Sequence, residues 1–443
     1  MQCDTNAVKD MIAELETIAI EEVSNDCLTP ECTKAATIIQ HSIDPNVAPC
    51  DDFYKFACGT FLQTTEVPKN KRSVNRYDFL NSKVQDQIKS IFEEPVQFNE
   101  PRFSTLSKNF YNACMNTTTI ENNGLDTVLG NLKEMGGWPL LEGLWKEENF
   151  DWKEATYDMQ RLGYNTYHLF SFNVVTDFSN STRNVLNIDQ PLLLIDRASL
   201  SNGFKDNYIK AYYNYMVDVA VSFGADKAIA EKELKETLEF EMLLANISLS
   251  EEERKNQTVL NNLMTLKELT QRYPSIPWNK YFNTLLKLAF VIGDDEIIKV
   301  SVPAFFEKFE ILINETPKRV LANYLSWKAV DESVPFLNRR IRNLQRKFSN
   351  SLSGPTERQA RWKECLQMTT NNMRVGVGAL YVRKYFTPES KKIAEELAID
   401  IAVQMQNILK EAHGVEYEHV SSLFHDQYET GVLLSLYRFL DSV

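Results

Sequence analysis

The 443-residue sequence lacks the features that mark several common classes of protein. It has no apolar run of 18 residues or more, so it predicts no membrane-spanning helix. Glycine and proline number only 15 each and gather in no one stretch, which excludes a flexible linker. Neither an internal repeat, nor a phosphate-binding loop, nor a Gly-x-Ser-x-Gly nucleophile elbow occurs.

Histidine is also scarce, and this bears on metal chemistry. The zinc-hydrolase motif His-Glu-x-x-His needs a Glu directly after a His, because two imidazoles hold the metal while the carboxylate polarises water. The residues that follow the five histidines are Ser42, Leu169, Gly414, Val420 and Asp426. His413, Glu416, His419 and His425 cluster near the C-terminus, but their spacings do not place the imidazoles on one helix face. The sequence predicts neither a catalytic nor a metal-binding residue in this chain.

Basic residues are in deficit. Lys and Arg total 48 against 61 Asp and Glu, which gives a net charge of −13. Phosphate binding needs a clustered basic surface, so we expect no nucleic-acid partner. The one basic cluster, over residues 339–347, surrounds apolar residues at helical spacing. We interpret it as the solvated face of a helix, with a patch for an acidic partner as the alternative.

Helical signals dominate what is present, and the sequence predicts a mainly α, multi-helical lobe. The clearest helix begins with Thr387 as cap and Pro388 at the first helical position, and runs to about Ala412. Its apolar stripe is Ile393, Leu397, Ile401, Met405 and Ile408.

Two further helices follow from similar signals. Thr316 and Pro317 repeat the Thr-Pro pattern, and the stripe that follows includes Lys328 through its aliphatic stem. Another predicted helix extends from about Asp226 to Ala245. One region is different: the aromatic and β-branched run 167–175, the turn-like residues 177–182 and the short run 184–188 predict a small β-hairpin near 165–188.

Cysteine is the one sparse residue type whose placement is informative. The seven cysteines are Cys3, Cys27, Cys32, Cys50, Cys58, Cys114 and Cys365. Four lie between 27 and 58 in polar, turn-rich sequence, which indicates disulfides or metal ligands. The first twenty residues are too charged for a secretory signal core. Either the chain lacks its targeting segment, or these are cytosolic thiols.

The stretch from Cys27 to Phe61 carries a long and specific motif. It reads CLTPECTKAATIIQHSIDPNVAPCDDFYKFACGTF and contains C-x4-C, then an Asp, then P-C-x-D-F-Y-x-F-x-C-G. This pattern resembles the start of the neprilysin and endothelin-converting enzyme family of zinc metalloendopeptidases. Later segments resemble the same family in the same order: FYNACMN at 110–116, GGWPL at 136–140, IDQPLLLIDR at 188–197, NYLSW at 323–327 and RWKECLQMTTNNMRVGVGALYV at 361–382.

The resemblance implies a domain organisation. Residues 27–412 are similar to the N-terminal, non-catalytic part of the family ectodomain, which forms a helical lid. Residues 1–26 are expected to be an N-terminal helical segment, and 413–443 a divergent tail. The family's His-Glu-x-x-His, its Asn-Ala-[Phe/Tyr] motif and its downstream Glu ligand lie beyond the matched segments and do not occur here.

The resemblance also assigns residues. It implies the disulfides Cys27–Cys32 and Cys114–Cys365, and it leaves Cys50 and Cys58 without partners because their family partners lie in the catalytic half. Asn116 begins a sequon that is glycosylated in relatives. Either Arg72 or Arg76, both near Tyr77, matches the Arg that holds a peptide's terminal carboxylate.

Together these features predict the lid lobe of a neprilysin-like zinc peptidase that acts on small peptides. No cofactor is expected in this chain, and zinc is expected in the complete enzyme. The expected partners are small peptides and a catalytic lobe or full-length relative. The expected location is extracellular or in the secretory pathway, with any membrane anchor on a segment outside this chain. The alternative is a non-catalytic secreted peptide-binding or decoy protein that pairs with a full-length relative.

Overall fold

The computed structural model describes residues 29–69, 71, 73–141, 145–256, 258–287, 291–354 and 359–411. The predicted N-terminal segment 1–26 and tail 413–443 therefore lie outside the described residues. The chain divides into two compact units. Unit 1 comprises residues 1–84 and 356–359, and unit 2 comprises residues 85–355 and 360–443.

Unit 1 contains α2 (Pro30–Gln40), α3 (Phe53–Thr64) and the start of α4 (Arg76–Glu93). Thr29 caps α2 by accepting a hydrogen bond from the backbone N–H of Cys32 at 3.3 Å, and Pro30 occupies the first helical position. Asp52 caps α3 in the same way through the N–H of Lys55 at 2.9 Å. Short polar side chains placed before apolar runs thus set both helix starts.

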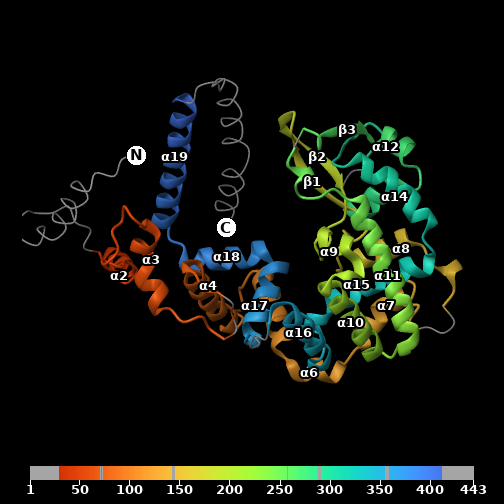
Figure 1. Cartoon of the computed structure of the whole chain (residues 1–443), viewed down its shortest axis with the longest axis horizontal. Helices are drawn as coiled ribbons and strands as arrows, with labels where there is room; N and C mark the ends of the chain where they lie inside the picture. Colours follow the sequence, from red (N-terminus) through yellow and green to blue (C-terminus); the bar gives the residue numbers. More distant parts are fainter. Residues whose placement is uncertain are drawn as a thin grey trace, which may run out of the picture. The chain divides into compact units, whose positions relative to one another are not determined.

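Unit 2 is built mostly of helices, as predicted (Figure 1). Its α-helices after α4 are α5 (Arg102–Met115), α6 (Thr117–Asn123), α7 (Asp126–Glu134), α8 (Trp152–Leu162), α9 (Arg197–Asn202), α10 (Asn207–Ser222), α11 (Lys227–Ile247), α12 (Leu266–Arg272), α13 (Trp278–Leu286), α14 (Pro303–Glu315), α15 (Lys318–Ser333), α16 (Arg339–Ser353), α17 (Arg361–Asn372), α18 (Arg374–Tyr385) and α19 (Pro388–Glu411). Short 3₁₀ turns are η1 (Glu147–Asn149), η2 (Gly203–Lys205), η3 (Glu253–Lys255) and η4 (Val334–Phe336).

The predicted hairpin is confirmed as β1 (Ser171–Asp177) and β2 (Asn180–Asp189), which pair antiparallel. It belongs to a larger sheet than expected. β4 (Ile297–Val300) pairs parallel with β2, and β3 (Asn262–Thr265) pairs antiparallel with β4, which gives the order β1-β2-β4-β3. Because β3 and β4 have only four residues each, neither is long enough to show a clear alternating pattern in the sequence.

The helix α15 is the centre of unit 2. Every residue from Leu321 to Val330 is buried, so neighbours surround this helix on all sides instead of covering the single stripe that was predicted. The predicted start was one residue early: Pro317 precedes the first helical residue, and the Thr316 hydroxyl donates to the carbonyl of Leu312 in α14 at 2.6 Å. The predicted helix near 226–245 is confirmed as α11, with Asp226 as its cap.

The expectation for Lys328 was wrong. Its ammonium does not reach solvent along a buried stem but lies in the core, 2.6 Å from Glu241 Oε1 in α11. The side chains of Lys328 and Glu241 are 2% and 1% exposed. A buried cation is tolerated only when a counter-charge accompanies it, and α11 supplies one here.

The helix α19 confirms the predicted Thr-Pro start, since the Thr387 hydroxyl accepts from the N–H of Ser390 at 3.2 Å. Its apolar stripe is not packed. Ile393, Leu397 and Ile401 are 66%, 59% and 62% exposed. Within the described part of the chain, no helix is both long and apolar enough to cross a membrane.

Candidate functional site

The motif around Asp44 and Cys58 forms a compact corner in unit 1. The buried carboxylate of Asp44 accepts hydrogen bonds from the backbone N–H of Asn46 at 3.0 Å and from Gln63 Nε2 at 3.2 Å. Gly59 in α3 lies against it so closely that a Cβ would come within 2.6 Å of Asp44 Cβ. The glycine of the motif's Cys-Gly pair therefore has a steric explanation, because only glycine allows α3 to approach Asp44 this closely.

Arg76, one of the two predicted carboxylate-binding residues, lies beside this corner at the start of α4. Its Nη2 donates to the hydroxyl of Ser42, and its guanidinium lies 4.3 Å from the centroid of the Phe61 ring. The Arg76 side chain is exposed, and no carboxylate among the described residues forms an ion pair with it. An arginine held by a ring and a hydroxyl keeps further N–H donors for an incoming anion. Arg72, the other candidate, lies outside the described residues.

The cysteines of unit 1 require one correction. Cys58 carries a free thiol and is partly buried. Cys50, which was expected to lack a partner, is disulfide-bonded. Cys32 is also disulfide-bonded, but its expected partner Cys27 lies outside the described residues. The prediction for Cys50 was wrong because it assumed that only a cysteine of the catalytic half could form a disulfide with Cys50.

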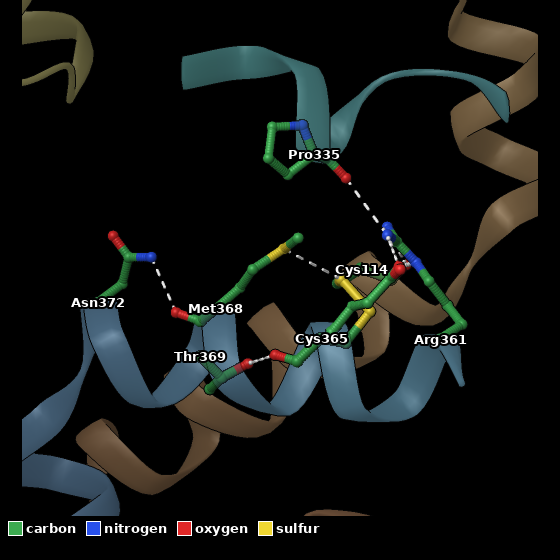
Figure 2. The surroundings of a disulfide bond; sticks show 8 residues. Cys114, Pro335, Arg361, Cys365, Met368, Thr369 and Asn372 are labelled. Carbon is green, nitrogen blue, oxygen red and sulfur yellow. Dashed lines mark hydrogen bonds and ion pairs between the residues drawn. A yellow bond between two sulfur atoms is a disulfide. The ribbon is translucent and has the colours of Figure 1, made fainter. Parts of the chain in front are cut away.

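In unit 2 a disulfide joins Cys114 of α5 to Cys365 of α17, the pair that the resemblance implied (Figure 2). The two residues are 251 positions apart in sequence, and their Cα atoms lie 5.6 Å apart. Arg361 reinforces the junction, because its Nε and Nη2 donate to the Cys114 carbonyl at 3.2 and 3.1 Å and its Nη1 donates to the Pro335 carbonyl at 3.3 Å. Three segments distant in sequence are thus tied at one point.

A cavity of about 600 Å³ opens close to this junction. Its walls include Phe110, Asn131, Tyr164, Glu332, Ser333 and Phe336. Asn131 Nδ2 donates to the Tyr164 hydroxyl at 2.9 Å, and that hydroxyl lies 3.1 Å from Ser333 Oγ. The cavity wall therefore combines amide, hydroxyl and carboxylate groups with three aromatic rings.

Glu332 is the charged group of this cavity. Its Oε1 lies 3.0 Å from Nε2 of the buried His168, and its Oε2 accepts from the backbone N–H of Asn165 at 3.1 Å. Burial acts to raise the pKa of Glu332, but the interactions with His168 and with Asn165 outweigh it and hold the pKa below its ordinary value. No sequence signal predicts this pair, because His168 and Glu332 are far apart along the chain and neither belongs to a motif.

The described residues contain no group of three His, Cys, Asp or Glu side chains placed to hold a metal ion. His41 lies exposed in unit 1, with Nδ1 2.7 Å from the Thr37 carbonyl. The other histidine with a described position, His168, is the partner of Glu332. His413, His419 and His425 lie outside the described residues.

Comparison with known proteins gives a consistent family match. The model of the N-terminal domain of "Peptidase family M13" matches residues 49–414. Neprilysin-2 of Drosophila melanogaster is 38% identical over 403 residues, which are 88% of this chain and 52% of that protein. Endothelin-converting enzyme 1 of Cavia porcellus is 30% identical, over 85% of this chain and 50% of its own length. This chain spans about half the length of these curated relatives.

The fold is also found among solved structures. The zinc metalloprotease ZMP1 of Mycobacterium tuberculosis, solved in complex with an inhibitor, superimposes with a TM-score of 0.69 at 18% sequence identity. The match covers 85% of this chain and 55% of ZMP1. At this level of identity the likeness extends to the fold alone.

Proposed function

Because the chain belongs to peptidase family M13, we propose that it is the N-terminal helical lobe of a neprilysin-like zinc endopeptidase. The observation that carries the proposal is the family match over residues 49–414, combined with relatives about twice as long as the matched segment. In this proposal the lobe restricts access and helps to bind small peptides, and residues 27–412 make up the lobe. In this proposal, bond cleavage and the zinc ligands belong to the half of the relatives that this chain does not match. No catalytic step is assigned to this chain.

Arg76 supplies the substrate contact of the proposed lobe. Its exposed guanidinium, its stacking on Phe61 and its hydrogen bond to Ser42 support a role in holding a peptide's terminal carboxylate. A guanidinium matches a carboxylate in charge and in the spacing of two parallel N–H donors. Peptides with a free C-terminus should therefore be preferred to amidated ones.

A chimeric enzyme tests the proposal. The matched half of Drosophila Neprilysin-2 is replaced by this chain, and hydrolysis of a small peptide is measured with and without a metal chelator. We expect chelator-sensitive hydrolysis by the folded chimera and none by this chain alone. In the chimera, Arg76→Ala should raise KM about tenfold for a peptide with a free carboxylate, from the loss of a charge-assisted pair. The same peptide with an amidated C-terminus is the control and should be unaffected.

Two results would decide against the proposal. Stoichiometric zinc and peptide hydrolysis by this chain alone would assign it the catalytic site. A folded but inactive chimera, together with tight association between this chain and full-length Neprilysin-2, would instead support the binding or decoy protein.

The proposal places the chain in the extracellular space or the secretory pathway. The Cys114–Cys365 disulfide supports this location, because such bonds persist in oxidising compartments. Asn116 is exposed, whereas the amide of Asn314, in another sequon, already donates to Ser275 Oγ and to the Glu310 carbonyl at 2.8 Å each. In material secreted by animal cells, we expect an N-glycan on Asn116 that is removed by glycosidase and lost in Asn116→Gln, with Asn314→Gln as the matched control. Secreted chain without a glycan at Asn116 would contradict this assignment.

A further inference from the structure

The outer edge of β1 is an unpaired strand edge. In the order β1-β2-β4-β3, β1 has a neighbour only on its β2 side, and in Figure 1 it lies on the side of the sheet away from α12 and α14. In an antiparallel pair, every second residue directs its N–H and C=O away from the partner strand. No other described segment forms backbone hydrogen bonds with β1 residues. The outward groups therefore form a row of open donors and acceptors.

Over Ser171–Val175, this edge lacks the features that usually protect strand edges. Natural edges are blocked by proline, by charged residues, by bulges or by being very short. β1 reads SFNVVTD and holds no proline or lysine, and its register shifts only between Thr176 and Asp177. The stretch Ser171–Val175 is therefore regular. β3, at the opposite edge, has only four residues and leads directly into α12.

The two faces of β1 differ in chemistry. On one face the Phe172 ring packs near Tyr281 and Phe282, at 6.2 and 6.1 Å between centroids, and Val174 follows on the same side, 62% exposed.

The other face carries a polar ladder. Ser301 Oγ donates to Asn187 Oδ1 at 2.7 Å, and Asn187 Nδ2 donates to Asn173 Oδ1 at 3.0 Å. The ladder ends at the exposed side chain of Asn173 on the sheet edge. The charged residues at the end of the hairpin, Asp177 and Arg183, pair with each other at 2.6 Å. An added strand would meet an apolar position beside Val174 and a hydrogen-bonding position beside Asn173, with no free charge.

The length of the edge distinguishes between possible occupants. Five residues extend about 17 Å. Pairing two such edges from two copies of the chain would cover far less than the roughly 1,200 Å² that a stable protein interface buries. A short extended peptide needs no such area, because main-chain hydrogen bonds supply its affinity. The edge is therefore better suited to a transient peptide than to a second copy.

We infer that the outer edge of β1 binds an extended, uncharged peptide segment as a fifth strand, with apolar and hydroxyl or amide side chains alternating along it. The peptide class rests on the proposed function, because members of a peptidase lobe meet peptides as substrates. The contact itself uses β1 alone and requires neither Arg76 nor a catalytic half.

A capped seven-residue peptide of alternating Val and Thr, acetylated and amidated, is the probe. Its fluorescently labelled form is titrated with the full 443-residue chain by anisotropy, and hydrogen exchange of residues 171–177 is followed by mass spectrometry. We expect binding together with slower exchange in β1. The same peptide N-methylated at alternate residues should not bind, because it lacks the donors. Because the capped peptide has no terminal carboxylate, it cannot test the proposed contact with Arg76. Failure of this peptide to bind would therefore not count against the proposed function, and an inactive chimera would not count against binding at β1.

A charge at the edge provides a second test. Val174→Glu should weaken binding about fivefold or more, since it adds a charge beside the apolar position of the docked strand. Val259→Glu is the matched control, because Val259 is 57% exposed and lies outside the sheet. Equal binding of the N-methylated peptide, or no change in exchange of 171–177, would overturn the inference. Dimerisation that protects β1 without peptide would do so too, because a second copy would then occupy the edge.

Discussion

The buried pair Lys328–Glu241 allows a sharp test of what holds unit 2 together. Lys328 of α15 and Glu241 of α11 are 2% and 1% exposed, with Nζ and Oε1 2.6 Å apart. The ammonium also lies 5.1 Å from the centroid of the Tyr324 ring. Glu241 Oε2 has no hydrogen-bond partner among the described residues, so Lys328 provides the principal compensation for this carboxylate. Replacing Lys328 with Met leaves a buried negative charge without a counter-ion.

The expected magnitude follows from that geometry. Breaking a buried pair by removing one partner costs about 3–5 kcal/mol, which is a loss of 100-fold or more in the ratio of folded to unfolded molecules. Removing both charges in the double variant Lys328→Met, Glu241→Leu should recover most of this loss, because an apolar pair of similar volume is often as stable as the ion pair. The two single changes should therefore be strongly non-additive.

The assay is urea unfolding followed by circular dichroism for the wild type, both single variants and the double variant. Lys280→Met is the matched control. Lys280 and Glu154 are also 2.6 Å apart, but they are 60% and 58% exposed, so the loss should be at most about 1 kcal/mol. If Lys328→Met costs no more stability than Lys280→Met while the fold is retained, the Lys328–Glu241 pair does not stabilise the core.

Three further predictions concern other parts of the chain. Replacing Cys114 and Cys365 by Ser should lower the free energy of unfolding in urea by up to about 5 kcal/mol, because the disulfide joins residues 251 positions apart. Cys58→Ser, which removes a free thiol, is the control. A loss below about 1 kcal/mol in the double variant would contradict the prediction. Because the pKa of Glu332 is lowered in the folded state, its contribution to stability is present above the unfolded value near 4.5 and is lost as pH falls through the folded pKa. Glu332→Gln should therefore flatten the decline in the free energy of unfolding between about pH 5 and 3. Parallel curves of stability against pH for the wild type and the variant would refute this. Gly59→Ala should lower the free energy of unfolding by about 1–3 kcal/mol, because the added Cβ would meet Asp44. Gly130→Ala is the control: this exposed helical position has nothing within 4 Å of an added Cβ, so the change should be neutral or stabilising. Similar effects at both positions would be evidence against the close contact at Gly59.

Local chemistry explains which elements could be predicted. Thr387 and Asp226 mark helix starts through short side chains that accept hydrogen bonds from N–H groups three residues further on, so the signal and its effect lie in one window of sequence. The β1–β2 hairpin is similarly local, since both strands and the turn are contiguous. The pairing of Cys114 with Cys365 came from resemblance, because no property of either segment specifies the other.

What the tertiary structure alone decided involves partners that are distant along the chain. The strand β4 pairs with β2, which lies more than 100 residues earlier in the chain, and β3 pairs in turn with β4. A four-residue stretch has too weak a strand preference to form without such a neighbour. The amphipathic pattern around Lys328 predicts that its ammonium reaches solvent. In the structure, α11 places Glu241 beside Lys328, and neighbouring elements bury α15 on all sides. The cavity beside Glu332 and the open edge of β1 arise in the same way. Burial and strand pairing depend on which elements pack together. The free energy of that packing depends on segments distant in sequence, so no single window of residues encodes it.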